Sequence, residues 1–210
     1  MVEVNYRQVP LAHLGLASKI EDSLGDAGVG MSDRGFRAIL NLRVDLAKQA
    51  GARESFEKAM GFTLPETPNT ANGKDGTEAL WLGPNEWQVV VDDNAPDAGT
   101  RWLQTVRQGM RGHYCAVVDV SNAQAIIGMT GPMAREVLER AVPLDMHPGA
   151  FKPGEVKQTV FGRHCGVIMH LRDESPVFDL YVRRSFAEYV WSYTRDCARG
   201  AQTDTAVLAG

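Results

Sequence analysis

Histidine and cysteine are the residue types in this sequence that most readily suggest metal binding or nucleophilic chemistry. Two places bring them together: His113 with Cys115, and His164 with Cys165. Neighbouring residues of a strand point to opposite faces, so His164 and Cys165 do not readily face one ion. His113 and Cys115 can share a face, but two ligands are too few for a stable site. No Cys-x-x-Cys pair occurs, so we predict no metal site and expect the cysteines, Cys197 included, to pack as small apolar residues.

Signatures of nucleotide binding and of nucleophilic catalysis are also missing. The glycines of GDAGVG, residues 25–30, follow no clear strand and open no strong helix, so a flexible turn is favoured over a phosphate site. Neither a Walker-type loop nor a Gly-x-Ser-x-Gly stretch occurs. His147 lies in a loop, where it can act as a catalytic base or hydrogen-bond the loop backbone. We predict no catalytic and no cofactor-binding residue in this chain.

Three polar residues leave two interpretations open. Asp119 and Ser121 end an apolar run, where either a binding group or a turn cap fits. Asp145 stands among apolar residues and prolines, and it either organises its loop or belongs to a ligand cradle.

Two tryptophans flank a turn in LWLGPNEWQVVV, residues 80–91. Pro84 suits the second position of a type I turn, and the flanking runs are rich in β-branched and aromatic residues, so we predict a hairpin. Trp81 and Trp87 then form a cross-strand pair. The pair can stack on a ligand ring, pack on this chain's own helices or contact another polypeptide.

The elements that must position these residues indicate an α+β fold with antiparallel sheets and packed helices. Residues 36–44 alternate as a half-buried strand, residues 46–61 are typical of a helix, and residues 63–77 of an exposed loop. The second half runs strand, strand, helix, three strands, helix, which is similar to a ferredoxin-like unit with an added strand. We expect an N-terminal α+β lobe over 1–110, a C-terminal ferredoxin-like lobe over 111–200, and a flexible tail over 201–210.

Composition narrows the class of protein. The 210 residues carry a formal net charge of −4 and a pI of about 5.7, which disfavours nucleic acid as a partner. No run of about 18 apolar residues is present, so we expect no membrane span. The first residues lack the pattern of a signal peptide, and we expect a cytoplasmic protein.

Three stretches together resemble the gamma subunit family of heterotetrameric bacterial sarcosine oxidase. They are LWLGPNEWQVVV, the run VVDVSNAQAIIGMTGPMAREVLERAVPLDMHPGAFKPGEVKQTVFGRHCGVIMH, and FDLYVRRSFAEYVWSYTRDCAR. The likeness extends over residues 11–199 and is most specific over residues 119–166. MTGPMAREVL and the order strand, LGPNEW, strand, helix are more distantly similar to the folate-binding aminomethyltransferase family, the T-protein of glycine cleavage, whose fold the chain is expected to share.

This resemblance implies an assembly with alpha, beta and delta subunits that oxidises sarcosine to glycine and hydrogen peroxide. With tetrahydrofolate, the assembly also forms 5,10-methylenetetrahydrofolate. The resemblance places FAD, FMN and NAD on the larger subunits and zinc on the delta subunit, with no cofactor on gamma. The chain is then a non-catalytic subunit that supports assembly, with interface residues expected at Trp81, Trp87, Asp145, His147 and Trp191. The alternatives are a folate-binding aminomethyltransferase-like protein acting alone and an adaptor for an unrelated partner.

Overall fold

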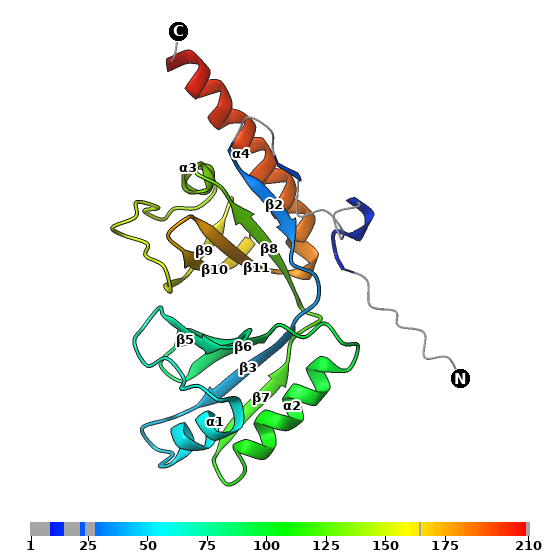
Figure 1. Ribbon diagram of the computed structural model, residues 1–210, viewed down its shortest axis with the longest axis vertical. Coiled ribbons are helices and arrows are strands. Elements are labelled where there is room, and N and C mark those ends of the chain that lie inside the picture. The colour runs from blue at the N-terminus through cyan, green and yellow to red at the C-terminus, as the bar shows by residue number, and fades with distance from the viewer. Residues whose placement is uncertain (1–8, 15–21, 24–27, 164, 209–210) are drawn as a thin grey trace, which may run out of the picture. The chain divides into compact units, whose positions relative to one another are not determined.

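The computed structural model describes residues 9–14, 22–23, 28–163 and 165–208 and divides the chain into two compact units (Figure 1). The first unit is Phe36–Ala123. The second combines the described residues before Phe36 with those from Gln124 onward. Both units pack helices on an antiparallel sheet, which confirms the predicted α+β class.

The first unit contains a five-stranded sheet in the order β4-β5-β6-β3-β7. The strands are β3 (Ala38–Val44), β4 (Ala71–Lys74), β5 (Thr77–Gly83), β6 (Glu86–Val91) and β7 (Cys115–Asp119). Without β4, the chain order is the βαββαβ arrangement of a ferredoxin-like unit, with its first strand next to the centre of the sheet.

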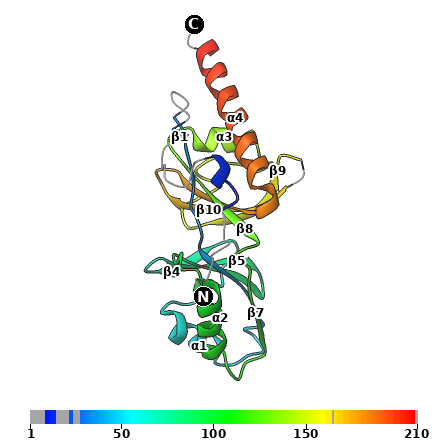
Figure 2. The same cartoon turned by 90° about the vertical axis from the view of Figure 1, so that its right-hand side faces the viewer.

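Helices α1 (Ala52–Met60) and α2 (Ala98–Gly109) cover one face of this sheet (Figure 2). The alternation predicted for residues 36–44 explains why. Leu40, Leu42 and Val44 all face the helices and are buried with residues of α1, α2, β6 and β7. The odd-numbered residues of β3 therefore face the other side of the sheet.

Two local predictions in this unit were inaccurate. The helix expected from residue 46 begins at Ala52, because Asp45 accepts hydrogen bonds from the backbone of Ala47 and Lys48 in a turn, and Gly51 is left-handed with φ of 79°. The loop expected over 63–77 contains β4, which reverses into β5 through Asp75 and Gly76. Both turn residues have positive φ, as the Asp-Gly hairpin turn requires.

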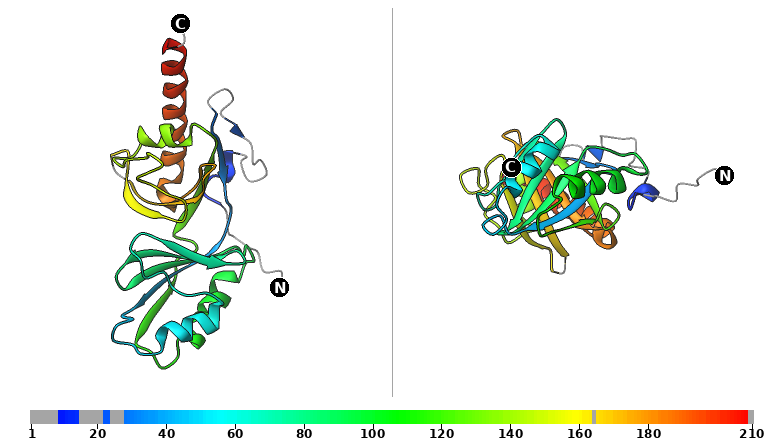
Figure 3. Two further views of the ribbon diagram at one scale, coloured as in Figure 1. Left: turned by 60° about the vertical axis from the view of Figure 1, so that its left-hand side comes forward. Right: turned by 90° about the horizontal axis from the view of Figure 1, so that it is seen from below.

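The second unit contains a six-stranded sheet in the order β1-β2-β8-β11-β10-β9. The strands are β1 (Asp22–Ser23), β2 (Gly30–Asp33), β8 (Gln124–Thr130), β9 (Val156–Phe161), β10 (Cys165–Asp173) and β11 (Val177–Arg183). Helices α3 (Ala134–Glu139) and α4 (Ala187–Leu208) share a core with one face of the sheet, while the short 3-10 helices are Ala12–Leu14 and Arg184–Phe186. Helix α4 continues past the sheet (Figure 3).

The division between the units differs from the boundary expected after residue 110. Strand β7 pairs with β3, so the first unit extends to Ala123, and β2 pairs with β8, so an N-terminal segment joins the second unit. Both differences arise from pairing between strands far apart in sequence, which local patterns do not reveal. The tail expected over 201–210 also differs, because α4 continues to Leu208.

A buried carboxylate on β11 binds an arginine of β10 and the arginine that directly follows β2. Asp179 accepts hydrogen bonds from Arg34 Nε at 2.9 Å and from Arg172 at 2.6 Å, and only 6% of its side chain is exposed. Gly128 lies opposite Asp179 in the register, and a Cβ there would collide with the Arg34 guanidinium. The missing side chain at Gly128 thus makes room for this charge cluster.

We expect Asp179→Asn to lower the free energy of unfolding by about 3 kcal/mol, because it leaves two guanidinium groups next to a neutral side chain in a largely buried site. Urea denaturation measures the change. Glu66→Gln is the control, since the Glu66–Arg53 pair is about half exposed and contributes less than about 1 kcal/mol. Equal losses for the two variants would show that burial adds nothing to the Asp179 cluster.

Candidate functional site

The predicted hairpin is present, and its two tryptophans pair across the strands. Trp81 of β5 lies opposite Trp87 of β6, on the face of the sheet that α1 and α2 cover. Trp87 exposes only 1% of its surface, and its indole N–H donates to the Pro65 carbonyl at 2.8 Å. Trp81 is half-buried against the same core. The structure thus supports packing on this chain's own helices, among the three alternatives weighed for the pair.

The five predicted interface residues fall into two groups. Trp87 and Trp191 each expose 1%, so they offer no surface to a partner and instead anchor the cores of the first and second units. Their large apolar side chains are better explained by burial than by the predicted contact. Trp81 is half-buried, whereas Asp145 and His147 are exposed, and for these three the interface role stays a prediction.

Asp145 and His147 organise the loop that holds them. Asp145 Oδ1 accepts a hydrogen bond from the His147 backbone N–H at 2.8 Å, and His147 Nδ1 accepts one from Gly149 at 3.1 Å. Arg135 of α3 donates to the carbonyls of Met146 and Phe151 and so secures the same loop. These bonds match the loop-organising alternative.

Asp119 and Ser121 form a turn cap after β7. The Ser121 hydroxyl donates to Asp119 Oδ1 at 2.5 Å and accepts from the Ile39 backbone N–H at 2.9 Å. The Asp119 carboxylate also lies against Gly99 in the first turn of α2, where a larger residue would displace it. The cap therefore ties β3, β7 and α2 together.

The predicted absence of a metal site remains a prediction for the chain as a whole. Over the described residues, no group of three His, Cys, Asp or Glu side chains is placed to hold an ion. His113 Nε2 lies 2.9 Å from the Ser55 hydroxyl on α1 and so connects the loop before β7 to that helix. His164 lies outside the described residues, as do residues 25–27 of GDAGVG.

The cysteines behave largely as expected. Cys165 is fully buried, whereas Cys115 and Cys197 are half-buried. Burial raises the pKa of all three thiols, which keeps them protonated and poorly nucleophilic at neutral pH.

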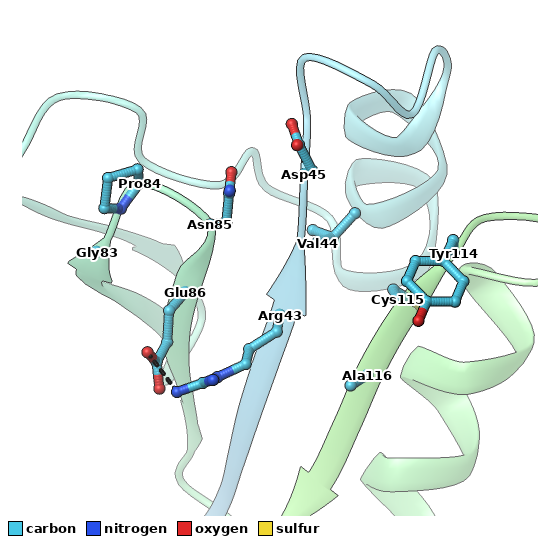
Figure 4. Close-up of a pocket in the computed structure, with 10 residues that line it drawn as sticks. All are labelled: Arg43, Val44, Asp45, Gly83, Pro84, Asn85, Glu86, Tyr114, Cys115 and Ala116. Carbon is cyan, nitrogen blue, oxygen red and sulfur yellow. Dashed lines mark hydrogen bonds and ion pairs between the residues drawn. The ribbon is translucent and has the colours of Figure 1, made fainter.

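A groove of about 530 Å³ opens at the end of β3 in the first unit. Figure 4 shows the β5–β6 turn on one side of it, the start of β7 on the other and the end of β3 between them. The lining residues are Arg43, Val44, Asp45, Gly83, Pro84, Asn85, Glu86, Tyr114, Cys115 and Ala116. The hairpin motif of the sequence thus forms one wall of a surface groove.

Each charged residue that lines this groove has an ion-pair partner. Arg43 donates to Glu86 at 2.8 Å, and Asn41 donates to the other oxygen of the same carboxylate at 2.8 Å. Lys48 lies 2.9 Å from Asp45. Burial alone would raise the pKa of Glu86, but the hydrogen bonds from Asn41 and Arg43 outweigh it and lower that pKa. The hydrogen bond from Lys48 likewise lowers the pKa of Asp45. Both carboxylates are ionised at neutral pH, each with a cation beside it.

Sequence reasoning did not identify this groove. Ala116 belongs to β7 and Tyr114 directly precedes it, while Pro84 and Asn85 come from a turn about 30 residues earlier. Only the pairing of β7 with β3 brings them near one another. A usable signal was the position of Tyr114, an aromatic residue at the polar start of an apolar run.

Comparison with known proteins shows one family that matches most of the chain. The sarcosine oxidase, gamma subunit family matches residues 43–200. A sarcosine oxidase subunit gamma from Corynebacterium sp. (strain U-96) is 29% identical over 146 residues, which are 69% of this chain and 68% of that protein.

Two solved structures share the fold. A chain of the heterotetrameric sarcosine oxidase from Corynebacterium sp. U-96 has a TM-score of 0.79 at 24% identity, covering 93% of this chain and 96% of that one. The glycine cleavage system aminomethyltransferase T from Bartonella henselae has a TM-score of 0.62 at 13% identity, covering 90% of this chain but 56% of that one. The predicted likeness to the aminomethyltransferase fold is confirmed.

Trp87→Phe tests whether the hairpin is anchored by its buried indole. We expect a loss of about 2–3 kcal/mol in the free energy of unfolding, because the Pro65 carbonyl loses its donor in a buried place and the smaller ring leaves a gap. Trp81→Phe at the half-buried partner is the control, with an expected loss below about 1 kcal/mol. Urea denaturation followed by circular dichroism compares them. A larger loss at Trp81 would contradict the assignment.

The lowered pKa of Glu86 predicts a pH-dependent contribution to stability. A carboxyl group whose pKa is lower in the folded state stabilises the fold above its unfolded value of about 4.3, and this contribution disappears as pH falls through the folded value. We therefore expect Glu86→Gln to be less stable than wild type by about 1–2 kcal/mol at pH 7, with the difference shrinking below pH 4. Glu57→Gln, at an exposed position of α1, should show no difference at either pH. A Glu86 difference that stays constant with pH would refute this prediction.

Proposed function

Because the chain belongs to the sarcosine oxidase gamma subunit family, we propose that it is the gamma subunit of a heterotetrameric sarcosine oxidase and supplies contact surface to that assembly. The observation that carries the proposal is the match over residues 43–200, reinforced by a shared fold across 93% of this chain. The enzyme would convert sarcosine to glycine and hydrogen peroxide, and with tetrahydrofolate to 5,10-methylenetetrahydrofolate. Its other members would be the alpha, beta and delta subunits.

A supporting role fits the way this chain uses its polar residues. The carboxylates that sequence analysis weighed for chemistry, Asp119 and Asp145, accept hydrogen bonds within their own turns. His113 is held by Ser55 of α1. Catalytic groups need to face a substrate in a defined pocket, and these are committed to loop structure. As the family resemblance implies, we propose that FAD, FMN, NAD and zinc are held by the partner subunits.

The comparison with aminomethyltransferase keeps one alternative open to test. The second candidate is a folate-binding protein acting alone, but the likeness to that aminomethyltransferase, at 13% identity, is one of fold. A fold does not by itself carry a function. We favour the oxidase subunit for this reason.

We also propose a cytoplasmic location. Among the described helices, none is long and apolar enough to cross a bilayer.

Co-expression of this chain with the alpha, beta and delta subunits of the same organism tests the proposal. We expect native mass spectrometry to give a four-subunit assembly that produces hydrogen peroxide from sarcosine. Omitting this chain should prevent assembly or lower turnover at least several-fold, while the purified chain alone should be colourless and inactive. Full assembly and activity without this chain, or sarcosine oxidation by the chain alone, would refute the supporting role.

Calorimetric titration of the purified chain with tetrahydrofolate distinguishes the oxidase subunit from a folate-binding protein acting alone. We expect no saturable heat. Micromolar binding that Asp145→Asn abolishes would favour a folate-binding protein acting alone.

A further inference from the structure

Strand β7 presents an exposed apolar stripe on the side of the sheet away from α1 and α2. Ala116 and Val118 are two residues apart on β7 and so point to the same face, and Tyr114 directly precedes the strand. Tyr114 exposes 88% of its surface and Val118 exposes 52%. Tyrosine is enriched among residues that dominate protein interfaces, and an exposed apolar row on one strand indicates an interaction site.

The groove at the end of β3 is continuous with this stripe, because Tyr114 and Ala116 belong to both. The exposed Pro84 adds apolar surface on its other side (Figure 4). Its charged lining residues all have an ion-pair partner: Arg43 pairs with Glu86 inside the groove, and Asp45 pairs with Lys48 outside the lining. A charged group entering the groove would thus meet no uncompensated opposite charge, and an uncharged apolar segment fits it best.

The geometry disfavours a small molecule as the occupant. Small-ligand sites enclose most of the ligand surface and place a few buried polar groups to orient it. Here Tyr114 is almost fully exposed, and the Arg43 side chain exposes 63% of its surface. An open, largely apolar surface of this kind suits a polypeptide that covers it from outside.

Addition of a strand to the free edge of β7 is also disfavoured. The Val120 backbone N–H donates to the Ile39 carbonyl. In an antiparallel pair, this means that the backbone N–H and C=O groups of the even-numbered residues of β7 bond to β3, while those of the odd-numbered residues point to the outer edge. On that edge, Arg107 of α2 donates to the Val117 carbonyl at 3.0 Å. The guanidinium occupies the middle of the edge, where a pairing strand would need a free acceptor. Contact through the face of β7 is the remaining mode.

We propose that the stripe Tyr114–Ala116–Val118 and the adjoining groove dock an uncharged, apolar segment of a partner subunit of the oxidase. The inference rests on the proposed function and adds the surface through which the chain binds. In the complex, the Tyr114 ring and the Val118 side chain lose contact with water, and this burial drives the association.

Val118→Asp tests the docking surface, because it puts a charge where an apolar partner must bind. In co-expression with the alpha, beta and delta subunits, we expect at least a tenfold weaker retention of this chain. The matched control is Val160→Asp on β9, the edge strand of the second unit, where the valine is similarly exposed at 48%. This control should be retained like wild type, and both variants should keep the wild-type unfolding midpoint.

Tyr114→Ala provides a second variant that adds no charge, and it should also weaken retention at least tenfold. A benzophenone cross-linker in place of Tyr114 should label one partner subunit at an uncharged segment, whereas the same group in place of Val160 should not. Wild-type retention of both Val118→Asp and Tyr114→Ala would overturn the docking surface and leave the proposed function intact. Equal loss in the Val160 control, or cross-links only between copies of this chain, would overturn it as well. Failure of the wild-type chain to assemble would instead overturn the proposed function on which it rests.

Discussion

The two-residue repeat of β3 determines what each face of the first unit can do. Its even-numbered residues are apolar and bury themselves under α1 and α2, between β6 and β7. The odd-numbered residues are thereby committed to the opposite face, where Arg43 meets Glu86 on one neighbour and lies opposite Ala116 on the other. Shifting the register by one residue would put Arg43 into the core. The core under α1 and α2 and the Arg43–Glu86 pair are thus both consequences of the alternation in β3.

A second constraint is that several carboxylates form their hydrogen bonds within this chain. Asp119 caps the turn after β7, Asp145 caps a loop, and Asp179 holds two arginines. Each of these carboxylates accepts hydrogen bonds from its own chain and is therefore less available to a substrate. The apolar residues at the surface show the opposite trend, because Tyr114 and Val118 remain uncovered in this chain. Internally bonded carboxylates and exposed apolar residues together suit a protein that acts by binding a partner.

Local features were predictable from the sequence, and long-range ones were not. The hairpin around Pro84 follows from turn chemistry, and the strand at 38–44 follows from alternation. The boundary between the units depends on β2 joining β8 and β7 joining β3, and these pairings join residues about 70 to 100 positions apart. Trp87 shows the same limit for a site. Its size suggested a contact residue, but its burial depends on helices distant in sequence.

The two units reach a similar sheet by different routes, which clarifies the relation to the aminomethyltransferase fold. In the first unit β3, β5, β6 and β7 supply the ferredoxin-like core in chain order. In the second unit, β8 takes the position that β3 has in the first. The strand beside β3 is β7, which follows it in the chain, whereas the strand beside β8 is β2, which precedes it. A segment that crosses from one end of the chain must be retained for the second sheet to be complete. Strand pairing of this kind depends on backbone hydrogen bonds and apolar alternation rather than on particular polar side chains. Two chains that are only 13% identical can therefore share the fold.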